Sequence, residues 1–392
     1  MNRIITIFTL LAVVASNVLA QNALERKRMT ITLTDGTTRV YDVSRIDHIN
    51  FAEGLNARVD LTLNKVAGYS LTVDATPTEN CGSYVLAVAP ATEAITDTAA
   101  YILQHISATE TDPKTIELGG LQPQTDYIVL ALAFDIYGIP CGTSSLSAST
   151  VEATDAEKPK VGYILYADGS WSRRLVKGRN PIGIIFAVST TEADQANGWT
   201  MGYAMALNDA AAQLAWATTA AEHQAGGDYT SAVEKGFLTD LDGYTHTVTL
   251  MQNASRHPAA AAACAYTAPT PARSSGWYLP SSGQWHDICV NLGGIDDMPN
   301  VVGNTEGYWN TPQVVSNTLN LINEHMSIAG SGNYTPITVP SGDYLWYWCS
   351  SESSGEQAYA IFFDQDQLVV EIAPYFKTYA FSTNRVRPVI AF

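Results

Sequence analysis

A run of short apolar segments separated by turns, from about Ala57 to Thr154, constrains the fold of this chain more than any other feature. The segments include "YSLTVDATP", "SYVLAVAP" and "DYIVLALAFD", and each reads as a short strand bounded by turn residues. Several such strands at short spacing predict a β-sandwich. We therefore expect an all-β domain over residues 56–154.

The N-terminal segment carries export and hairpin signals. Residues 1–20 combine a charged start with a short apolar run and a small-residue end, which predicts a secretory signal peptide and no membrane span. Because Gln21 stands where a lipoprotein carries Cys, we expect no lipid anchor. Residues 29–51 alternate on both sides of Asp35-Gly36, a favourable two-residue turn, so a β-ribbon is expected within residues 21–55. We expect a soluble exported protein in the periplasm, at the cell surface or outside the cell.

The charge balance excludes some partners. With 21 Lys+Arg against 38 Asp+Glu, the formal net charge is −17. Nucleic acids and anionic membranes attract basic patches, so neither is an expected partner, although the charge could also serve solubility alone.

The rest of the chain has mixed character. Charged residues at 155–160 suit a linker, and residues 161–392 contain strand-like runs at both ends with Ala-rich and Gly/Ser/Asn-rich stretches between them. This favours an α+β domain. The fold class is therefore multidomain, with an all-β N-terminal part followed by an α+β domain.

The stretch "GWYLPSSGQWHDICVNLGG" predicts a structural helix. Ser281 or Ser282 can cap a helix over about Gly283–Asn291, and Gly293-Gly294 ends it. Trp285, Ile288 and Cys289 then share one face, so the stretch is interpreted as a scaffold rather than a ligand contact.

Five cysteines occur in a chain that enters an oxidising compartment. Cys81 precedes the third predicted strand and Cys141 follows the sixth, and these loops share one pole of a sandwich. We expect a disulfide between them, with two reduced thiols as the alternative. The apolar surroundings of Cys264 and Cys349 predict inert thiols, and whether Cys264, Cys289 and Cys349 pair is left open.

Two resemblances concern the N-terminal half. The segment "DGT...Y.VS.IDHINF" resembles the start of many exported Bacteroidetes surface proteins. The phrase "LQPQTDYIVLALAFDIYG" resembles the fibronectin type III repeat. That resemblance implies that Leu121 fills the core and that Tyr127 is a corner tyrosine whose hydroxyl bonds nearby backbone.

The C-terminal part resembles bacterial C-type-lectin-like domains of the major-paralogous type, the FISUMP and Lcl C-terminal families. The segments "GYILYADGSWS", "GYAMALNDA", "GWYLPSSGQWHDI" and "YWCSSES...AYAIFFD...VRPVIAF" carry the resemblance over about residues 160–392. Gln284 departs from it, because an acidic residue is commoner there. The resemblance implies that the first and last strands of the domain pair in one sheet.

Motifs for chemistry are sparse. The calcium-binding loops of sugar-binding C-type lectins do not occur, and "DQDQ" at Asp364–Gln367 is better explained as a hairpin turn, so we expect no cofactor and no metal, with calcium possible but unsupported. The resembling fold is also similar to formylglycine-generating enzymes, but no reactive cysteine pair or nucleophile elbow is found. His257 and His286 are expected at the surface or a boundary. We expect no enzyme.

A binding surface is the favoured hypothesis. Residues 295–348 are rich in Gly, Asn, Ser and Tyr, a composition that suits recognition loops. The candidate ligand contacts are Tyr308, Trp309, Asn310, Tyr334, Tyr344 and Trp346. We expect a non-enzymatic adhesion protein that binds a glycan or an extracellular protein. The alternative is a structural tip or cap of a surface fimbrial assembly, in which surface-fibre subunits are the partners.

Overall fold

The computed structural model describes residues 28–32, 36–46, 55–219, 236–297, 299–303, 305–340, 343–380 and 384–392. The chain forms two compact units, Met1–Gly54 and Leu55–Phe392. In the first unit, β1 (Arg28–Thr32) and β2 (Thr38–Asp42) pair antiparallel and a 3-10 turn follows at Val43–Arg45. This pair agrees with the expected ribbon. The predicted signal peptide and Asp35 lie outside the described residues.

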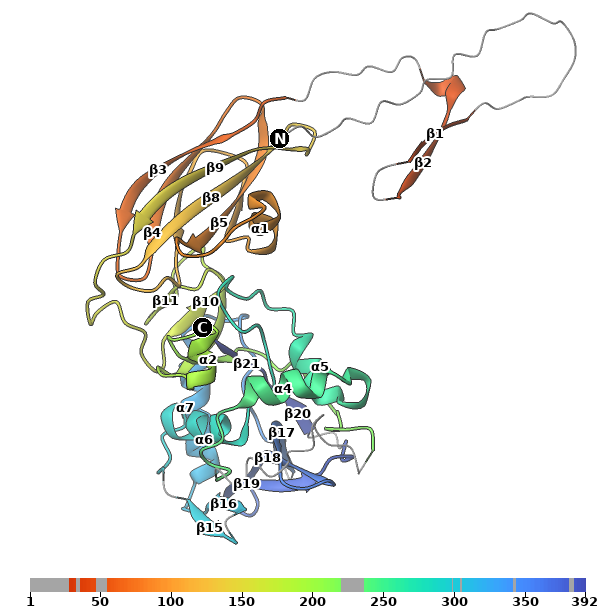
Figure 1. Ribbon diagram of the computed structural model, residues 1–392. Coiled ribbons are helices and arrows are strands. Elements are labelled where there is room, and N and C mark those ends of the chain that lie inside the picture. Colours follow the sequence, from red (N-terminus) through yellow and green to blue (C-terminus); the bar gives the residue numbers. More distant parts are fainter. Residues whose placement is uncertain are drawn as a thin grey trace, which may run out of the picture. The chain divides into compact units, whose positions relative to one another are not determined.

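The second unit begins with the predicted β-sandwich (Figure 1). One sheet has the order β3-β4-β7 and the other β6-β5-β8-β9, with α1 in the connection between β5 and β6. The elements are β3 (Val59–Val66), β4 (Leu71–Pro77), β5 (Cys81–Pro90), α1 (Thr98–Gln104), β6 (Ala108–Glu110), β7 (Lys114–Leu118), β8 (Asp126–Asp135) and β9 (Pro140–Ser149). Inward-facing residues of both sheets, such as Val73, Leu86 and Val129, form one core.

The sandwich has fibronectin type III-like features at the expected residues. Leu121 is fully buried in its core. The Tyr127 hydroxyl accepts a hydrogen bond from the Gln122 backbone N–H at 2.8 Å. Both roles implied by the resemblance are confirmed.

The expected disulfide between Cys81 and Cys141 is not formed, because the structure has both as free thiols. Cys81 starts β5 and Cys141 lies in β9, and both strands pair with β8, which runs between them. Strands two places apart in a sheet are separated by about 9–10 Å, beyond the Cα separation of about 7 Å that a disulfide tolerates. The two residues share a pole of the sandwich, but a strand stands between them.

Two sheets form the C-terminal part of the unit. The five-stranded sheet has the order β11-β10-β12-β13-β21, and the seven-stranded sheet the order β14-β20-β17-β18-β19-β16-β15. The strands of the first are β10 (Ile164–Tyr166), β11 (Trp171–Ser172), β12 (Pro181–Ala187), β13 (Tyr203–Ala206) and β21 (Val389–Ala391). Those of the second are β14 (Ala211–Ala212), β15 (Asn300–Val302), β16 (Glu306–Trp309), β17 (Tyr344–Glu352), β18 (Gln357–Asp364), β19 (Val369–Phe376) and β20 (Asn384–Val386).

The first and last strands of this part share a sheet but do not pair, which corrects the expectation. β21 pairs with β13, and β12 and β13 stand between β21 and β10. Both intervening strands are apolar and almost wholly buried, so they occupy the centre of the sheet. The terminal strand still closes the sheet, since Tyr278 bridges to Val389 on its other side.

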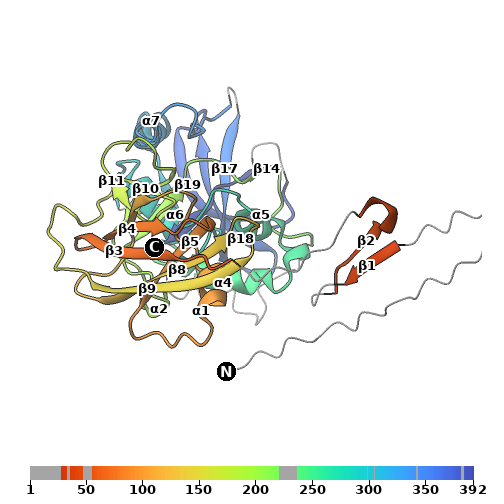
Figure 2. The same ribbon diagram turned by 90° about the horizontal axis from the view of Figure 1, so that it is seen from above.

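Helices pack on both faces of the seven-stranded sheet, over β17–β19 on one face and over β17 and β20 on the other (Figures 1 and 2). The helices are α2 (Glu192–Ala196), α4 (Gly243–Met251), α5 (Pro258–Cys264), α6 (Ser282–Asn291) and α7 (Val314–Ser327), with a 3-10 turn at Ala254–Arg256. Residues of α6 and α7 pack with Leu345 and Tyr347 in one core, whereas α4 and α5 pack with Trp348 in another. Among the described residues, no helix combines the length and apolar character needed to cross a bilayer.

The α6 stretch is the scaffold that the sequence predicts. Ser281 is the N-cap and forms a capping box with Gln284, and its hydroxyl donates to the Asp240 carbonyl at 2.6 Å. The buried Gln284 amide also donates to the Tyr278 hydroxyl at 2.7 Å, while its Oε1 accepts from the Ser281 N–H. A carboxylate cannot donate to Tyr278, so a glutamine at this buried position satisfies a donor and an acceptor without burying a charge.

The sandwich and the C-terminal part contact each other directly. Arg179 forms an ion pair with Glu117 of β7 and donates to Ser170 Oγ at 2.7 Å. The segment expected as a linker is itself anchored, because the Trp171 indole N–H donates to the Glu157 carbonyl at 2.8 Å and the Glu157 carboxylate accepts from the Gly68 N–H.

Candidate functional site

The six predicted ligand contacts fall at three places. Tyr308, Tyr344 and Trp346 lie on β16 and β17 of the seven-stranded sheet, with Asn310 just beyond β16. Trp309 points to the opposite side of that sheet, into the core beneath α6 and α7. Tyr334 follows α7 and packs against the same core. The six residues predicted to form one binding surface therefore lie at separate places in the fold.

The strand register places three of these residues beside others that the sequence analysis did not single out. Trp346 lies opposite Phe362, Phe362 opposite Glu371, and Glu371 opposite Tyr308. Directly opposite residues in antiparallel strands point to the same side of the sheet. A row of side chains thus crosses β17, β18, β19 and β16. We call this row, together with its neighbours Tyr344 and Tyr375, the aromatic face.

Its rings form one contiguous cluster. Trp346 is 4% exposed and contacts Tyr375, Phe362 and Tyr344 at centroid separations of 4.4, 5.8 and 5.8 Å. Tyr344, Phe362 and Tyr375 are half-buried. Trp346 is therefore the base of the cluster, and the surrounding rings keep accessible surface for a ligand.

Polar groups on the same face are positioned beside the rings. The Tyr375 hydroxyl donates to Glu371 Oε2 at 3.1 Å. Burial raises the pKa of Glu371, and the negative charge of Glu306 raises it further. At the sheet edge, the Asn300 amide donates to Asn310 Oδ1 at 3.4 Å. The face therefore offers hydroxyl, carboxylate and amide groups around apolar rings, a combination common in ligand sites.

Trp309 borders a separate groove of about 490 Å³ between the end of α6 and α7. Its indole N–H donates to the Asp296 carbonyl at 2.7 Å, and the His286 ring stacks on it with centroids 5.8 Å apart. Asn317 and Asn320 of α7 also line the groove. Because Trp309 is only 5% exposed, it acts mainly as the wall of this groove.

One set of residues has the donor types of a metal site. One ligand atom each from Asp240, Asp242 and His246 lies within 4.8 Å of the others. However, Asp240 already accepts from Ser351 Oγ at 2.5 Å and from the Asp242 N–H at 3.1 Å. Ser351 in turn accepts from the Ser282 N–H at 3.0 Å. This hydrogen-bond network joins the starts of α4 and α6 to β17. These bonds explain why the polar side chains gather here, and we interpret the cluster as a structural junction.

Cys289, Cys349 and His257 are buried, whereas Cys264 is exposed. Cys289 and Cys349 are fully buried, and burial raises the pKa of both thiols, which disfavours the reactive thiolate. His257 is 2% exposed, so the expectation that it lies at the surface or a boundary is wrong. Its Nδ1 contacts the Leu250 carbonyl at 3.0 Å and its ring packs edge-on against Trp216, so it fills the core between α4 and α5.

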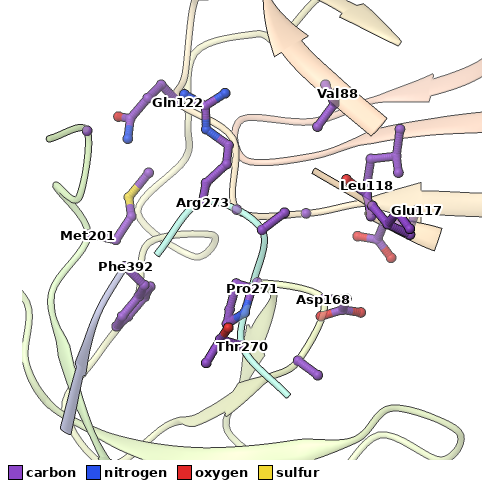
Figure 3. Close-up of a pocket in the computed structure, with 18 residues that line it drawn as sticks. Val88, Glu117, Leu118, Gln122, Asp168, Met201, Thr270, Pro271, Arg273 and Phe392 are labelled. Carbon is purple, nitrogen blue, oxygen red and sulfur yellow. The ribbon is translucent and has the colours of Figure 1, made fainter. Parts of the chain in front are cut away.

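A small cavity lies where the sandwich meets the C-terminal part (Figure 3). Its lining includes Gln122 and Glu117 from the sandwich and Asp168, Arg273 and Phe392 from the other part. With a volume of about 50 Å³ it has room for a few water molecules rather than for a sugar. The cavity is a feature of the contact between the two parts.

Sequence reasoning missed Phe362, Glu371 and Tyr375. Their alternation within "AYAIFFD" and "VVEIAPYF" marks two strands that flank the "DQDQ" turn. The turn is confirmed, since Asp364 Oδ1 accepts the N–H groups of Asp366 and Gln367 at 2.9 and 2.8 Å. Pairing the two strands across this turn would have placed Phe362 opposite Glu371.

The chain matches no protein-family model and no curated protein. Similar solved structures include a myokine, at 16% identity over 24% of this chain and 95% of that one, with a TM-score of 0.19. A fourth fibronectin type III domain from human is 13% identical over 30% of this chain and 95% of that one, with a TM-score of 0.22. The sensor domain of the anti-sigma factor RsgI4 from Pseudobacteroides cellulosolvens is 14% identical over 26% of this chain and 98% of that one, with a TM-score of 0.16.

Proposed function

We propose that this chain is an exported, non-enzymatic adhesion protein whose C-terminal domain binds a glycan on the aromatic face, with the fibronectin-like sandwich as a spacer. The row of Trp346, Phe362, Glu371 and Tyr308 across four strands is the observation that carries the proposal. The resemblance of the C-terminal segments to bacterial C-type-lectin-like domains, and of the first residues to a signal peptide, supports it.

The chemistry of the face suits a sugar ring. Aromatic side chains supply broad apolar area for the C–H groups of a sugar at little cost in side-chain entropy. The Glu371 carboxylate and the hydroxyls of Tyr308 and Tyr375 can accept or exchange hydrogen bonds with sugar hydroxyls. A broad sheet face admits an extended oligosaccharide more readily than a deep pocket does.

The test is a glycan array with the full chain, followed by calorimetry on the best ligand. Tyr308→Ala and Tyr344→Ala remove half-buried aromatic area from the face, and we expect each to weaken binding about tenfold or more. Tyr137→Ala is the matched control, because Tyr137 is 77% exposed on the sandwich hairpin between β8 and β9. It should leave affinity unchanged.

Two outcomes would contradict the proposal. If the full chain bound no glycan but co-purified with surface-fibre subunits, an assembly role would replace recognition. If a glycan bound with equal affinity to both face variants and to the control, the binding site would lie elsewhere.

A further inference from the structure

The strands that build the aromatic face carry acidic but no basic side chains. Strands β15 to β19 contain no Lys, Arg or His, and their acidic residues are Glu306, Glu352, Asp364 and Glu371. Glu352 pairs with the buried Lys377, and Asp364 accepts backbone N–H groups of its own turn. Within the part of the chain that the structure describes, Glu306 and Glu371 have no basic partner.

These two carboxylates border the rings. Glu371 lies between Phe362 and Tyr308 in the cross-strand row. Glu306 is two residues from Tyr308 on β16 and therefore points to the same side of the sheet. The charge of Glu306 disfavours ionisation of Glu371, and both side chains are only partly exposed to water.

A cation bound on this face offsets the repulsion between the two carboxylates and the cost of their partial burial. It neutralises the paired negative charges, and it gains attraction from the electron-rich faces of Phe362 and Tyr375. A neutral sugar offers only its hydroxyls to the two carboxylates, and an acidic sugar is repelled by them. The net charge of −17 also favours encounter with cationic ligands.

We infer that the aromatic face selects sugars that carry a free, protonated amino group, and that Glu371 sets this preference. The inference rests on the proposed function and names its ligand class. The ammonium group lies beside the Glu371 carboxylate as a charge-assisted hydrogen bond donor, and the sugar ring covers the neighbouring aromatic rings.

Two oligosaccharides that differ only in acetylation test this. The full chain is titrated with a glucosamine hexamer and with an N-acetylglucosamine hexamer, at a pH where the free amine is protonated. We expect the amine form to bind about tenfold more tightly or better, and its affinity to fall as salt is added. Glu371→Gln should weaken binding of the amine form about tenfold and change binding of the acetylated form little. Glu324→Gln, an equal charge change at an exposed position of α7, is the matched control and should have no effect.

The outcomes separate the inference from the proposed function. Equal affinity for both hexamers, lowered by Tyr308→Ala but not by Glu371→Gln, would contradict the selectivity and leave glycan recognition in place. Absence of binding to these hexamers and to a glycan array would overturn both. Should Glu371→Gln unfold the domain, the pH series with unmodified protein decides. Affinity for the amine form must then fall as the amine loses its proton, and unchanged affinity overturns the inference.

Discussion

Asp194 is a carboxyl group that the fold buries without a cation among the described residues. It is 4% exposed and accepts a hydrogen bond from the Tyr203 hydroxyl. Burial raises the pKa of Asp194 more than the hydrogen bond from Tyr203 lowers it. The folded state therefore holds this proton more tightly than the unfolded state does.

Because the folded pKa of Asp194 is raised, this carboxyl group makes the protein less stable as pH rises. The contribution of Asp194 to stability is fully present below its unfolded pKa of about 3.9, and it is lost as pH rises through the higher folded pKa. The free energy of unfolding should therefore fall less steeply with rising pH in Asp194→Asn than in the parent protein. Urea denaturation at a series of pH values above about 4 measures it, and parallel curves for the two proteins would refute the assignment.

Arg387 is a fully buried cation with a full set of acceptors. Its Nε donates to Asp209 Oδ1 at 2.7 Å, and its other nitrogens reach the carbonyls of Leu207 and Thr335 at 3.3 and 3.2 Å. Arg387→Met takes the short ion pair from Asp209 and the guanidinium from both carbonyls. Among the described residues, Asp209 then keeps only the Tyr347 hydroxyl at 3.4 Å and Arg385 at 3.7 Å. We expect a loss of about 3–5 kcal/mol in the free energy of unfolding. The exposed Arg173→Met serves as control and should change it by less than about 0.5 kcal/mol.

At the scale of elements, α6 depends on its first residue. Ser281 is fully buried, and its hydroxyl both caps the helix and donates to the Asp240 carbonyl. Ser281→Ala should therefore cost about 2 kcal/mol in the free energy of unfolding, from the lost cap and the lost bond. Thr245→Ala at an exposed position of α4 is the comparison. Equal thermal shifts for the two variants would show that the cap does not stabilise the junction.

Elements with local signals could be predicted and those fixed by distant partners could not. The Ser281 cap and the turn at Asp364 depend on neighbours a few residues away. By contrast, the place of Glu371 beside Tyr308 depends on two strands separated by 59 residues along the chain, from Asn310 to Leu368. Likewise Trp309 has the composition of a ligand contact, but strand alternation turns it into the core. A count of aromatic residues cannot show which side of a sheet each one occupies.

At the scale of the molecule, the C-terminal strand is an essential part of a sheet. Val389, Ile390 and Ala391 are fully buried, and β21 contacts β13 on one side and Tyr278 on the other. Deletion of residues 389–392 removes apolar burial of about 5 kcal/mol or more, which is comparable to the whole stability of a domain.

We expect the shortened protein to lose cooperative unfolding of residues 161–392 while the sandwich keeps its structure. Near-UV circular dichroism should show loss of the tryptophan signal, because all eight tryptophans lie in this part, from Trp171 to Trp348. Calorimetry should retain one smaller transition. An unchanged melting curve would contradict the role assigned to β21.

The position of the last two strands also bears on how the protein is made. β20 joins the seven-stranded sheet and β21 the five-stranded one, so neither sheet is complete until the segment from Asn384 to Ala391 has left the ribosome. A nascent chain that lacks it can finish the sandwich but not the domain that follows. During biosynthesis both sheets of residues 161–392 thus stay open until this segment has emerged, long after the sandwich can close.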